Sequence, residues 1–362
     1  MYQSIQACRA LAALLVVFFH LGGNLAKDKY FGAHAVPLQR IFLFGGSAGV
    51  AFFFVLSGFI IVMIHWQDFG QPARLRPYLR KRLVRIYPTY ILIFCAVYAA
   101  ALLVPSLRDA MPTDVGVLLE SLLLVPQDVA MVGGTGAPVI VVAWSLQYEV
   151  VFYAVVALAF VHPLVCAFAV LALAGNFVWQ MLGGARQFPA SFFANELMLL
   201  FAMGVGAAAA LHRRWQFGRP LSVAILVGVA FFAIGAASVW RDESHNAYFN
   251  LGYGVCGALA IVALTQAERA QPARFASRML SLLGDASYAL YLIHFPLIAV
   301  LCKLAVAAGL RGVTGVGVAF VAITLACVAT SVAFHLWIER PMLRLMSGNG
   351  GRKSGRARCG TT

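Results

Sequence analysis

Long apolar runs recur along nearly the whole chain and alternate with short polar or basic segments. Each run approaches the roughly 20 residues that an α-helix needs to cross the hydrocarbon core of a bilayer. The pattern predicts an all-α polytopic membrane protein with about ten transmembrane helices. These spans are expected at residues 6–24, 43–65, 87–105, 139–161, 163–182, 192–212, 220–240, 249–267, 286–308 and 313–338.

Composition favours a single membrane domain. Of the 362 residues, 62% are apolar and only 11% are charged, whereas soluble domains carry about 25% charged residues. Residues 1–341 are therefore assigned to the membrane domain. Residues 342–362 are expected to form a disordered, basic, cytoplasmic tail that can touch anionic lipid headgroups. The seven cysteines show no CxxC motif and no metal-ligand spacing, which predicts neither a disulfide framework nor a metal site.

The net charge of +14 would suggest a nucleic-acid partner for a soluble protein, but here it reports topology. Lys and Arg gather in the cytoplasmic loops of membrane proteins. With the ten spans above, 19 of the 27 basic residues fall on the side of the N-terminus and 8 on the other. We therefore expect both termini in the cytoplasm and no nucleic-acid partner. The longest outer connection, about 106–138, is expected to hold a short interfacial helix near 118–125 and to serve as a lid or docking surface.

Arg9 and His20 lie in the first span, eleven residues apart, with only apolar side chains between them. At about 100° per residue both lie on one helix face, offset by roughly 16 Å along the axis. Such groups are costly in lipid and are expected to face the protein interior. For Arg9, snorkelling to lipid headgroups fits as well as a functional role. For His20, the apolar surroundings favour proton transfer over a helix–helix hydrogen bond.

Glu149 lies near the middle of the fourth span, where a carboxylate must be paired or protonated. It either locks two helices together, or orients His20 or a substrate hydroxyl. Trp144 and Tyr148 share its helix face and either stack on a sugar ring or belong to the interfacial aromatic belt. Ser57 lies in the second span, where small residues also allow close helix approach.

Arg82 and Arg85 precede the third span and are three residues apart, so they project together from a helix. They are either a positive-inside anchor or a clamp that grips phosphate oxygens with two guanidinium groups. Glu339 and Arg340 end the tenth span and are interpreted as a structural helix-end pair.

Tyr291 and His294 lie one helical turn apart in the ninth span, just before Pro296. The proline removes a backbone hydrogen bond from the helix. A second histidine inside the membrane, beside a helix break, favours a functional role, although a structural hydrogen bond competes with it.

Together these elements resemble the acyltransferase 3 family of integral-membrane O-acyltransferases, especially its bacterial exopolysaccharide and lipopolysaccharide acetylases. The resemblance covers residues 1 to about 341. No single motif is specific, but five in order on ten predicted spans make a strong match. The matching residues are Arg9 with His20, Ser57-Gly-Phe59, Arg82-Leu-Val-Arg85, Trp144-Ser-Leu-Gln-Tyr-Glu149 and Ser287-Tyr-Ala-Leu-Tyr-Leu-Ile-His294.

The resemblance implies a multi-pass enzyme of the bacterial inner membrane that moves an acyl group, usually acetyl, from cytoplasmic acyl-coenzyme A to a carbohydrate hydroxyl. Acetyl-coenzyme A would be a co-substrate, with no tightly bound cofactor, and the acceptor a surface or lipid-linked glycan. The expected roles are donor binding for Arg9, Arg82 and Arg85, acceptor binding for Trp144, Tyr148 and Ser57, and catalysis for His20, Glu149, His294 and Tyr291. In this scheme His20 is the general base, and an acyl-histidine intermediate is the less favoured variant.

Two other functions compete with this one. A transporter also has many spans, buried charges and a broken helix, but paired broken helices in corresponding halves are not apparent here. An acyltransferase could instead act on a cytoplasmic small molecule, although the long outer loop argues mildly against that. The acceptor sugar and the oligomeric state stay open.

Overall fold

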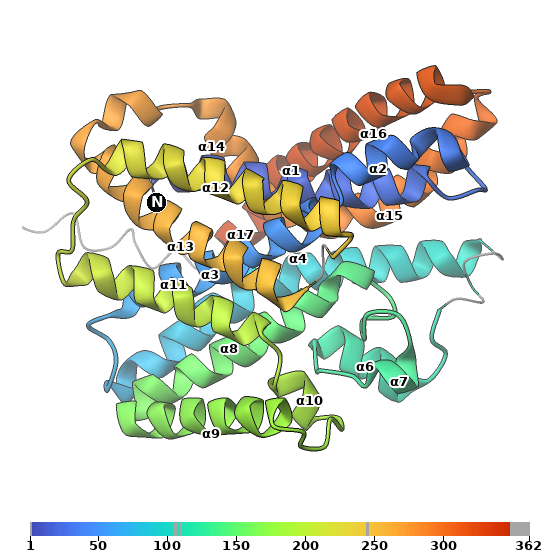
Figure 1. Ribbon diagram of the computed structural model, residues 1–362. Helices are drawn as coiled ribbons and strands as arrows, with labels where there is room; N and C mark the ends of the chain where they lie inside the picture. The colour runs from blue at the N-terminus through green and yellow to red at the C-terminus, as the bar shows by residue number, and fades with distance from the viewer. Residues whose placement is uncertain (1, 105–107, 109–110, 244–245, 348–362) are drawn as a thin grey trace, which may run out of the picture.

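The computed structural model describes residues 2–104, 108, 111–243 and 246–347. Within these residues every regular element is helical, and ten segments are long and apolar enough to cross a membrane, which confirms the predicted fold class. In Figure 1 most of the long helices run side by side across the molecule. The spans contain α1 (Gln3–Leu25), α3 (Gly45–His65), α4 (Leu75–Leu103), α8 (Trp144–Val161), α9 (Pro163–Met181), α11 (Leu197–His212), α12 (Pro220–Arg241), α13 (Ala247–Ala270), α15 (Ser287–Ala307) and α16 (Gly312–Phe334).

Shorter elements connect or extend the spans. The short helices are α2 (Val36–Ile41), α6 (Val115–Leu123), α7 (Val129–Val132), α10 (Ala190–Phe193), α14 (Arg278–Asp285) and α17 (Arg340–Ser347). The tight turns are η1 (Gly32–Ala35), η2 (Pro72–Arg74), η3 (Val141–Ala143), η4 (Pro272–Phe275) and η5 (His335–Glu339), the last of which is π-helical. Because α17 continues to Ser347, helix extends six residues past the predicted domain boundary; residues 348–362 of the predicted tail lie outside the described residues.

At two junctions, the helix ends predicted from hydropathy can be compared with the observed ones. The tight turn expected between the fourth and fifth spans is present: His162 ends α8 and caps α9, its Nδ1 accepting the Leu164 N–H at 3.2 Å. By contrast, α4 starts twelve residues before the predicted residue 87. Its first turns are too basic to count as apolar, yet they continue the same helix, which passes through Pro88 without a break.

Helix α3 is the centre of the bundle, and glycines allow its neighbours to approach closely. A Cβ atom on Gly45 would lie 2.5 Å from the Leu15 carbonyl oxygen of α1, and one on Gly49 would lie 2.6 Å from that of Ala12. Four-residue spacing of small residues is a common means of bringing membrane helices together. Accordingly, 72% of the α3 span is buried, compared with 6% of the α9 span at the edge of the bundle.

The chain between α7 and α8 is irregular, and its second half is mostly buried. Val139, Ile140, Val142 and Ala143 are almost fully enclosed. Irregular backbone inside a membrane protein is tolerated only where protein groups satisfy it. Gln147 does so by donating from Nε2 to the Gly136 carbonyl at 2.9 Å and to the Val125 carbonyl at 3.2 Å. The last turn of this segment, η3, leads directly into α8 and packs against α15.

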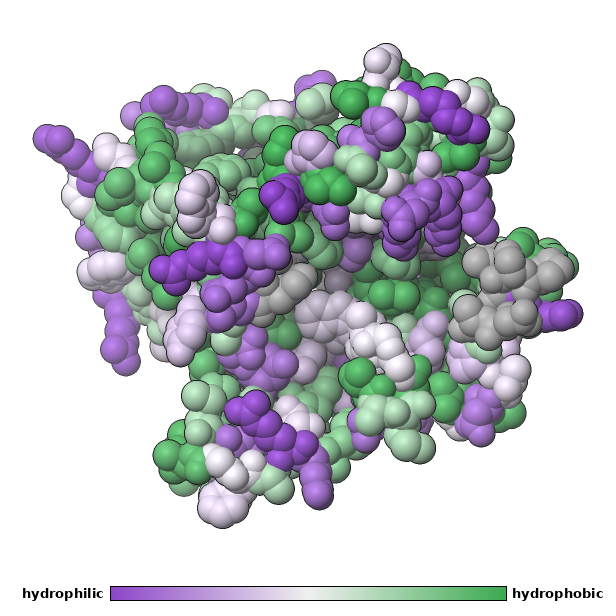
Figure 2. All heavy atoms as spheres, turned by 45° about the vertical axis from the view of Figure 1, so that its right-hand side comes forward, coloured by the Kyte–Doolittle hydropathy of each residue, from purple (hydrophilic) through white to green (hydrophobic). Residues whose placement is uncertain are grey.

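The predicted short helix in the outer connection is present as α6. Its exposed side chains Val115, Leu119 and Leu123 are four residues apart and form one apolar stripe. Tyr90 of α4 holds the other side by donating to the Ser121 carbonyl at 2.6 Å. Figure 2 turns this end of the molecule forward and shows a surface hollowed between α6–α7 and the ends of α15 and α16.

Candidate active site

A cavity of about 560 Å³ lies between α1, α3, α4, α8, α15 and the η5–α17 segment. Its volume is within the usual range of small-molecule sites. Four of the lining residues are arginines and two are carboxylates, so the walls favour an anionic ligand. The polar lining residues are Gln6, Arg9, Ser57, Arg82, Arg85, Ser145, Glu149, Tyr153, Asp285, Ser287, Tyr288, Tyr291, His335 and Arg340.

Arg9 faces this cavity, as expected for a charged group inside a bundle. Its Nη2 donates to Ser287 Oγ at 3.0 Å and its Nη1 to Gln6 Oε1 at 3.1 Å. Gln6 in turn donates from Nε2 to Asp285 Oδ1 at 2.5 Å. Contacts from α14 and α15 thus orient the guanidinium, so the alternative in which Arg9 reaches out to lipid does not describe this arrangement.

Arg82 and Arg85 project from α4 into the same cavity, where aromatic rings flank both. The Arg82 guanidinium carbon lies 5.8 Å from the ring centre of Tyr78 and 5.7 Å from that of Tyr153. The Arg85 guanidinium carbon lies 5.5 Å from the ring centre of Tyr288. The Nε atom of Arg82 is buried and has no hydrogen-bond partner among the described residues. A buried donor of this kind is costly unless a ligand satisfies it.

Glu149 sits in the second turn of α8, on the cavity wall. Its Oε1 accepts a hydrogen bond from Ser57 Oγ at 3.0 Å and another from the Tyr153 hydroxyl. The carboxylate therefore joins α3 to α8, as its structural interpretation predicts. It also lines the cavity together with Ser57, as its functional interpretation requires.

His20 and His294 are brought together from α1 and α15. His20 Nδ1 lies 3.1 Å from His294 Nε2. His294 is fully buried, and its Nδ1 lies 2.9 Å from the Leu290 carbonyl. Because a carbonyl only accepts, Nδ1 of His294 carries hydrogen and Nε2 of the neutral ring accepts from His20. His20 is then protonated at Nδ1, which also faces the Val16 carbonyl at 3.0 Å, and its lone pair falls on Nε2.

Tyr291 forms the end wall between the cavity and this histidine pair. Its ring centre lies 5.9 Å from that of His294 and 6.3 Å from that of Phe53. Its hydroxyl lies 2.8 Å from Ser145 Oγ and donates to the Val142 carbonyl at 2.9 Å. Arg9 lines the cavity, whereas His20 is not among its lining residues. Helical periodicity places both on one face of α1, but the cavity that Arg9 lines ends at Tyr291, whose ring contacts His294.

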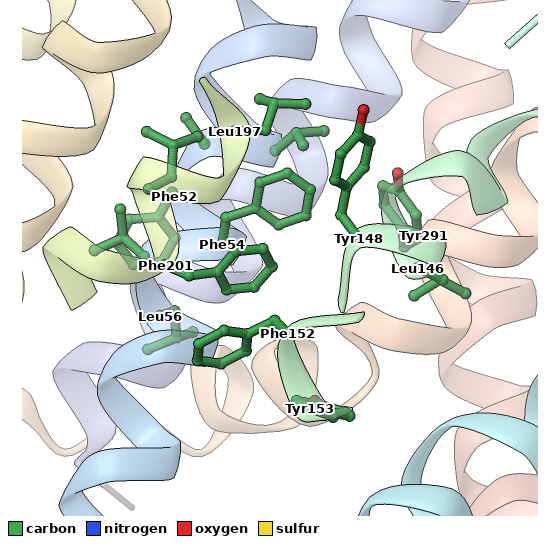
Figure 3. Packing of buried hydrophobic residues seen from close by; sticks show 14 of the residues in the cluster. Phe52, Phe54, Leu56, Leu146, Tyr148, Phe152, Tyr153, Leu197, Phe201 and Tyr291 are labelled. Atoms are coloured by element: carbon green, nitrogen blue, oxygen red, sulfur yellow. The ribbon is translucent and has the colours of Figure 1, made fainter. Parts of the chain in front are cut away.

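Trp144 and Tyr148 belong to an aromatic cluster outside the cavity lining. The Tyr148 ring stacks on Phe192 with centres 4.1 Å apart, and Trp144 meets Tyr148 edge to face at 6.1 Å. Figure 3 shows the neighbouring part of the cluster, where Phe54 and Phe201 stack with centres 4.7 Å apart. The structure thus supports their packing role and leaves acceptor binding by these two residues a proposal.

Sequence reasoning missed several groups in the cavity. Tyr153, one turn after Glu149, and Asp285, before the ninth span, had no assigned role. His335 was also missed, although it precedes Glu339 by four residues in an apolar span, a spacing that favours pairing on a helix. Arg340 was assigned a purely structural role but lines the cavity.

Comparisons with known proteins agree with this architecture. The chain is 31% identical over 313 residues to "Exopolysaccharide production protein ExoZ" of Rhizobium meliloti, covering 83% of this chain and 90% of that protein. It is 27% identical over 339 residues to "Acyltransferase MdmB" of Streptomyces mycarofaciens, covering 82% of this chain and 78% of that protein. No solved structure matches. The family model described as "Acyltransferase domain" matches residues 2–336, and this chain therefore belongs to that family of membrane acyltransferases.

Proposed function

We propose that this protein transfers an acyl group, most simply acetyl, from cytoplasmic acyl-coenzyme A to a hydroxyl of a surface or lipid-linked glycan. The observation that carries the proposal is an arginine-lined cavity whose end wall, Tyr291, contacts His294, the buried member of the histidine pair. The printed name of the Rhizobium relative, which concerns exopolysaccharide production, supports a glycan as acceptor.

Coenzyme A has several phosphates and a long, flexible pantetheine arm. Arg9, Arg82 and Arg85 supply the guanidinium groups that would hold the phosphates, and the unpaired Nε of Arg82 would gain a partner on binding. The arm would then extend along the cavity toward Tyr291. The charge bias of the loops supports a cytoplasmic position for this end of the bundle, and hence the bacterial inner membrane.

The chemistry follows from the hydrogen positions on the two imidazoles. With hydrogen on Nδ1, His20 Nε2 would accept the proton of the acceptor hydroxyl as the oxygen attacks the thioester carbonyl carbon. The C–S bond then breaks, the acyl group stays on the sugar oxygen, and coenzyme A leaves as the thiolate. His294 would hold His20 in the reactive tautomer, while Glu149 and Ser57 would position the acceptor.

For a donor arm in this cavity to reach His20, the end wall has to open. In this proposal the Tyr291 ring turns away from Ser145 and Val142 as the donor arm arrives. Its hydroxyl, freed from those two partners, becomes available to the thioester oxygen, where negative charge develops.

Reconstitution tests the proposal. Purified protein in proteoliposomes receives acyl-labelled acetyl-coenzyme A and lipid-linked glycan. We expect label in the glycan, and at least about 100-fold less with His20→Ala. Label transferred only to an added small molecule would favour the cytoplasmic-acceptor alternative, and passage of solute without any transfer would favour a transporter. Mass spectrometry of surface polysaccharide from cells with and without the protein identifies the modified sugar.

A further inference from the structure

The C-terminal π-helical turn presents two further basic groups to the cavity. In η5 the Arg340 N–H bonds to the His335 carbonyl, five residues back. In a regular α-helix, residues five apart point about 140° away from each other. The wider turn instead aligns them, so that both His335 and Arg340 line the cavity. Single π-helical turns of this kind are frequent at functional sites.

Glu339 fixes the His335 ring. Its Oε2 lies 2.6 Å from His335 Nδ1, and its Oε1 accepts from Thr89 Oγ1 at 3.5 Å. Glu339 is fully buried and does not line the cavity. The segment therefore contributes an imidazole and a guanidinium to the cavity lining, but no carboxylate. His335 is only 8% exposed, and its Nε2 has no hydrogen-bond partner among the described residues.

Helix α17, which begins at Arg340, packs against α4, the helix that carries Arg82 and Arg85. Arg80 Nη2 of α4 donates to the Met346 carbonyl at 3.0 Å. Arg340 is exposed, at the mouth of the cavity, while His335 lies deeper in its wall. Four guanidinium groups and one imidazole therefore line the same cavity.

The geometry points to His335 and Arg340 as ligands of a phosphate group of the acyl donor, with Glu339 as a positioning residue. A protonated imidazole donates through both nitrogens, here to the Glu339 carboxylate on one side and to a phosphate oxygen on the other. This inference rests on the proposed function, because it names the part of the donor that the C-terminal segment recognises.

Equilibrium binding by the full-length protein in detergent tests this inference with coenzyme A, its 3′-dephospho form and pantetheine. We expect His335→Phe and Arg340→Gln to weaken coenzyme A binding on the order of tenfold or more, the usual effect of losing a hydrogen bond to a charged group. Pantetheine, which lacks these phosphates, should bind the variants and the wild type equally. The 3′-dephospho form shows whether the 3′-phosphate or the diphosphate is the group bound.

Arg344→Gln is the matched control, because Arg344 is an exposed arginine of the same helix outside the cavity lining. His335→Phe leaves the buried Glu339 carboxylate without its ring partner and can unfold the protein. Arg340→Gln changes an exposed residue, so this variant tests the inference even where His335→Phe does not fold. Wild-type protein that binds coenzyme A no more tightly than pantetheine overturns the proposed donor site and this inference with it. Tight wild-type binding that Arg340→Gln and folded His335→Phe both retain overturns this inference alone.

Discussion

The Nδ1 atom of His20 lies 3.1 Å from the Nε2 atom of His294, although the two residues are separated by 274 positions in the chain. The hydrogen bond that His294 makes to the Leu290 carbonyl decides which nitrogen of each ring carries hydrogen. It leaves the lone pair of His20 on Nε2, the form that a general base requires.

His20→Ala should lower acyl transfer by roughly 10²- to 10⁴-fold, the usual contribution of a general base. Transfer from labelled acetyl-coenzyme A measures the loss, and elution in size-exclusion chromatography shows whether the protein stays folded. His34→Ala is the control, because His34 is an exposed histidine of η1 outside the cavity lining. Full activity in the His20 variant would remove the proposed base.

Comparing His294→Ala with His294→Gln separates the role of His294 in orienting the His20 ring from its role in packing. The glutamine carbonyl can still accept a hydrogen bond from His20 Nδ1, so this variant should keep more activity than alanine. Both changes disturb a fully buried position, and we expect both to lower the melting temperature. The comparison of kcat between variants of equal melting temperature isolates the orienting effect. Equal kcat values in the two variants would contradict it.

Arg85→Gln should raise KM for acyl-coenzyme A on the order of tenfold, because one charged contact to phosphate is lost. KM for the acceptor should not change. Arg76→Gln removes the same charge from the exposed start of α4, outside the cavity lining, and should leave both constants unchanged. If both variants shift KM for the donor alike, the basic cluster acts through general attraction or as a membrane anchor.

Glu149→Gln keeps the shape of the side chain but removes its charge, so Ser57 and Tyr153 keep an oxygen to which they can donate. We expect acyl transfer to fall by about tenfold or more, through positioning of the acceptor, with donor binding retained. Glu120→Gln, on the exposed surface of α6, controls for loss of a carboxylate. A variant with normal transfer but lower stability would show that Glu149 only joins α3 to α8.

Gly204→Ala should destabilise the protein by about 1–3 kcal/mol, the usual cost of overpacking. The added Cβ would collide with the Val55 carbonyl oxygen of α3, a backbone atom that cannot turn aside. Gly206→Ala, two residues further along α11, meets no atom within 4 Å and should be neutral. Thermal unfolding in detergent compares the two. Equal melting temperatures would show that the α3–α11 contact is looser than the structure has it.

The hydropathy pattern was sufficient to predict the ten spans, because crossing a bilayer demands about 20 apolar residues in each helix whatever its neighbours are. The positions of helix ends were predicted less accurately where polar residues continue a helix, as in the first turns of α4. Arg9, Glu149 and His294 were identifiable as interior groups for a similar reason, since a charged or polar side chain in lipid is costly wherever the other helices lie.

The sequence by itself therefore determined which segments are helices and which residues avoid lipid, because both depend on local composition and on the solvent. Only the tertiary structure decided that His20 pairs with His294, that Tyr291 lines the cavity and contacts His294, and that a π-helical turn adds His335 and Arg340 to its wall. Those relationships depend on how helices distant in sequence rotate against one another. Close glycine contacts and side-chain volumes set that rotation, and a one-dimensional pattern does not contain it.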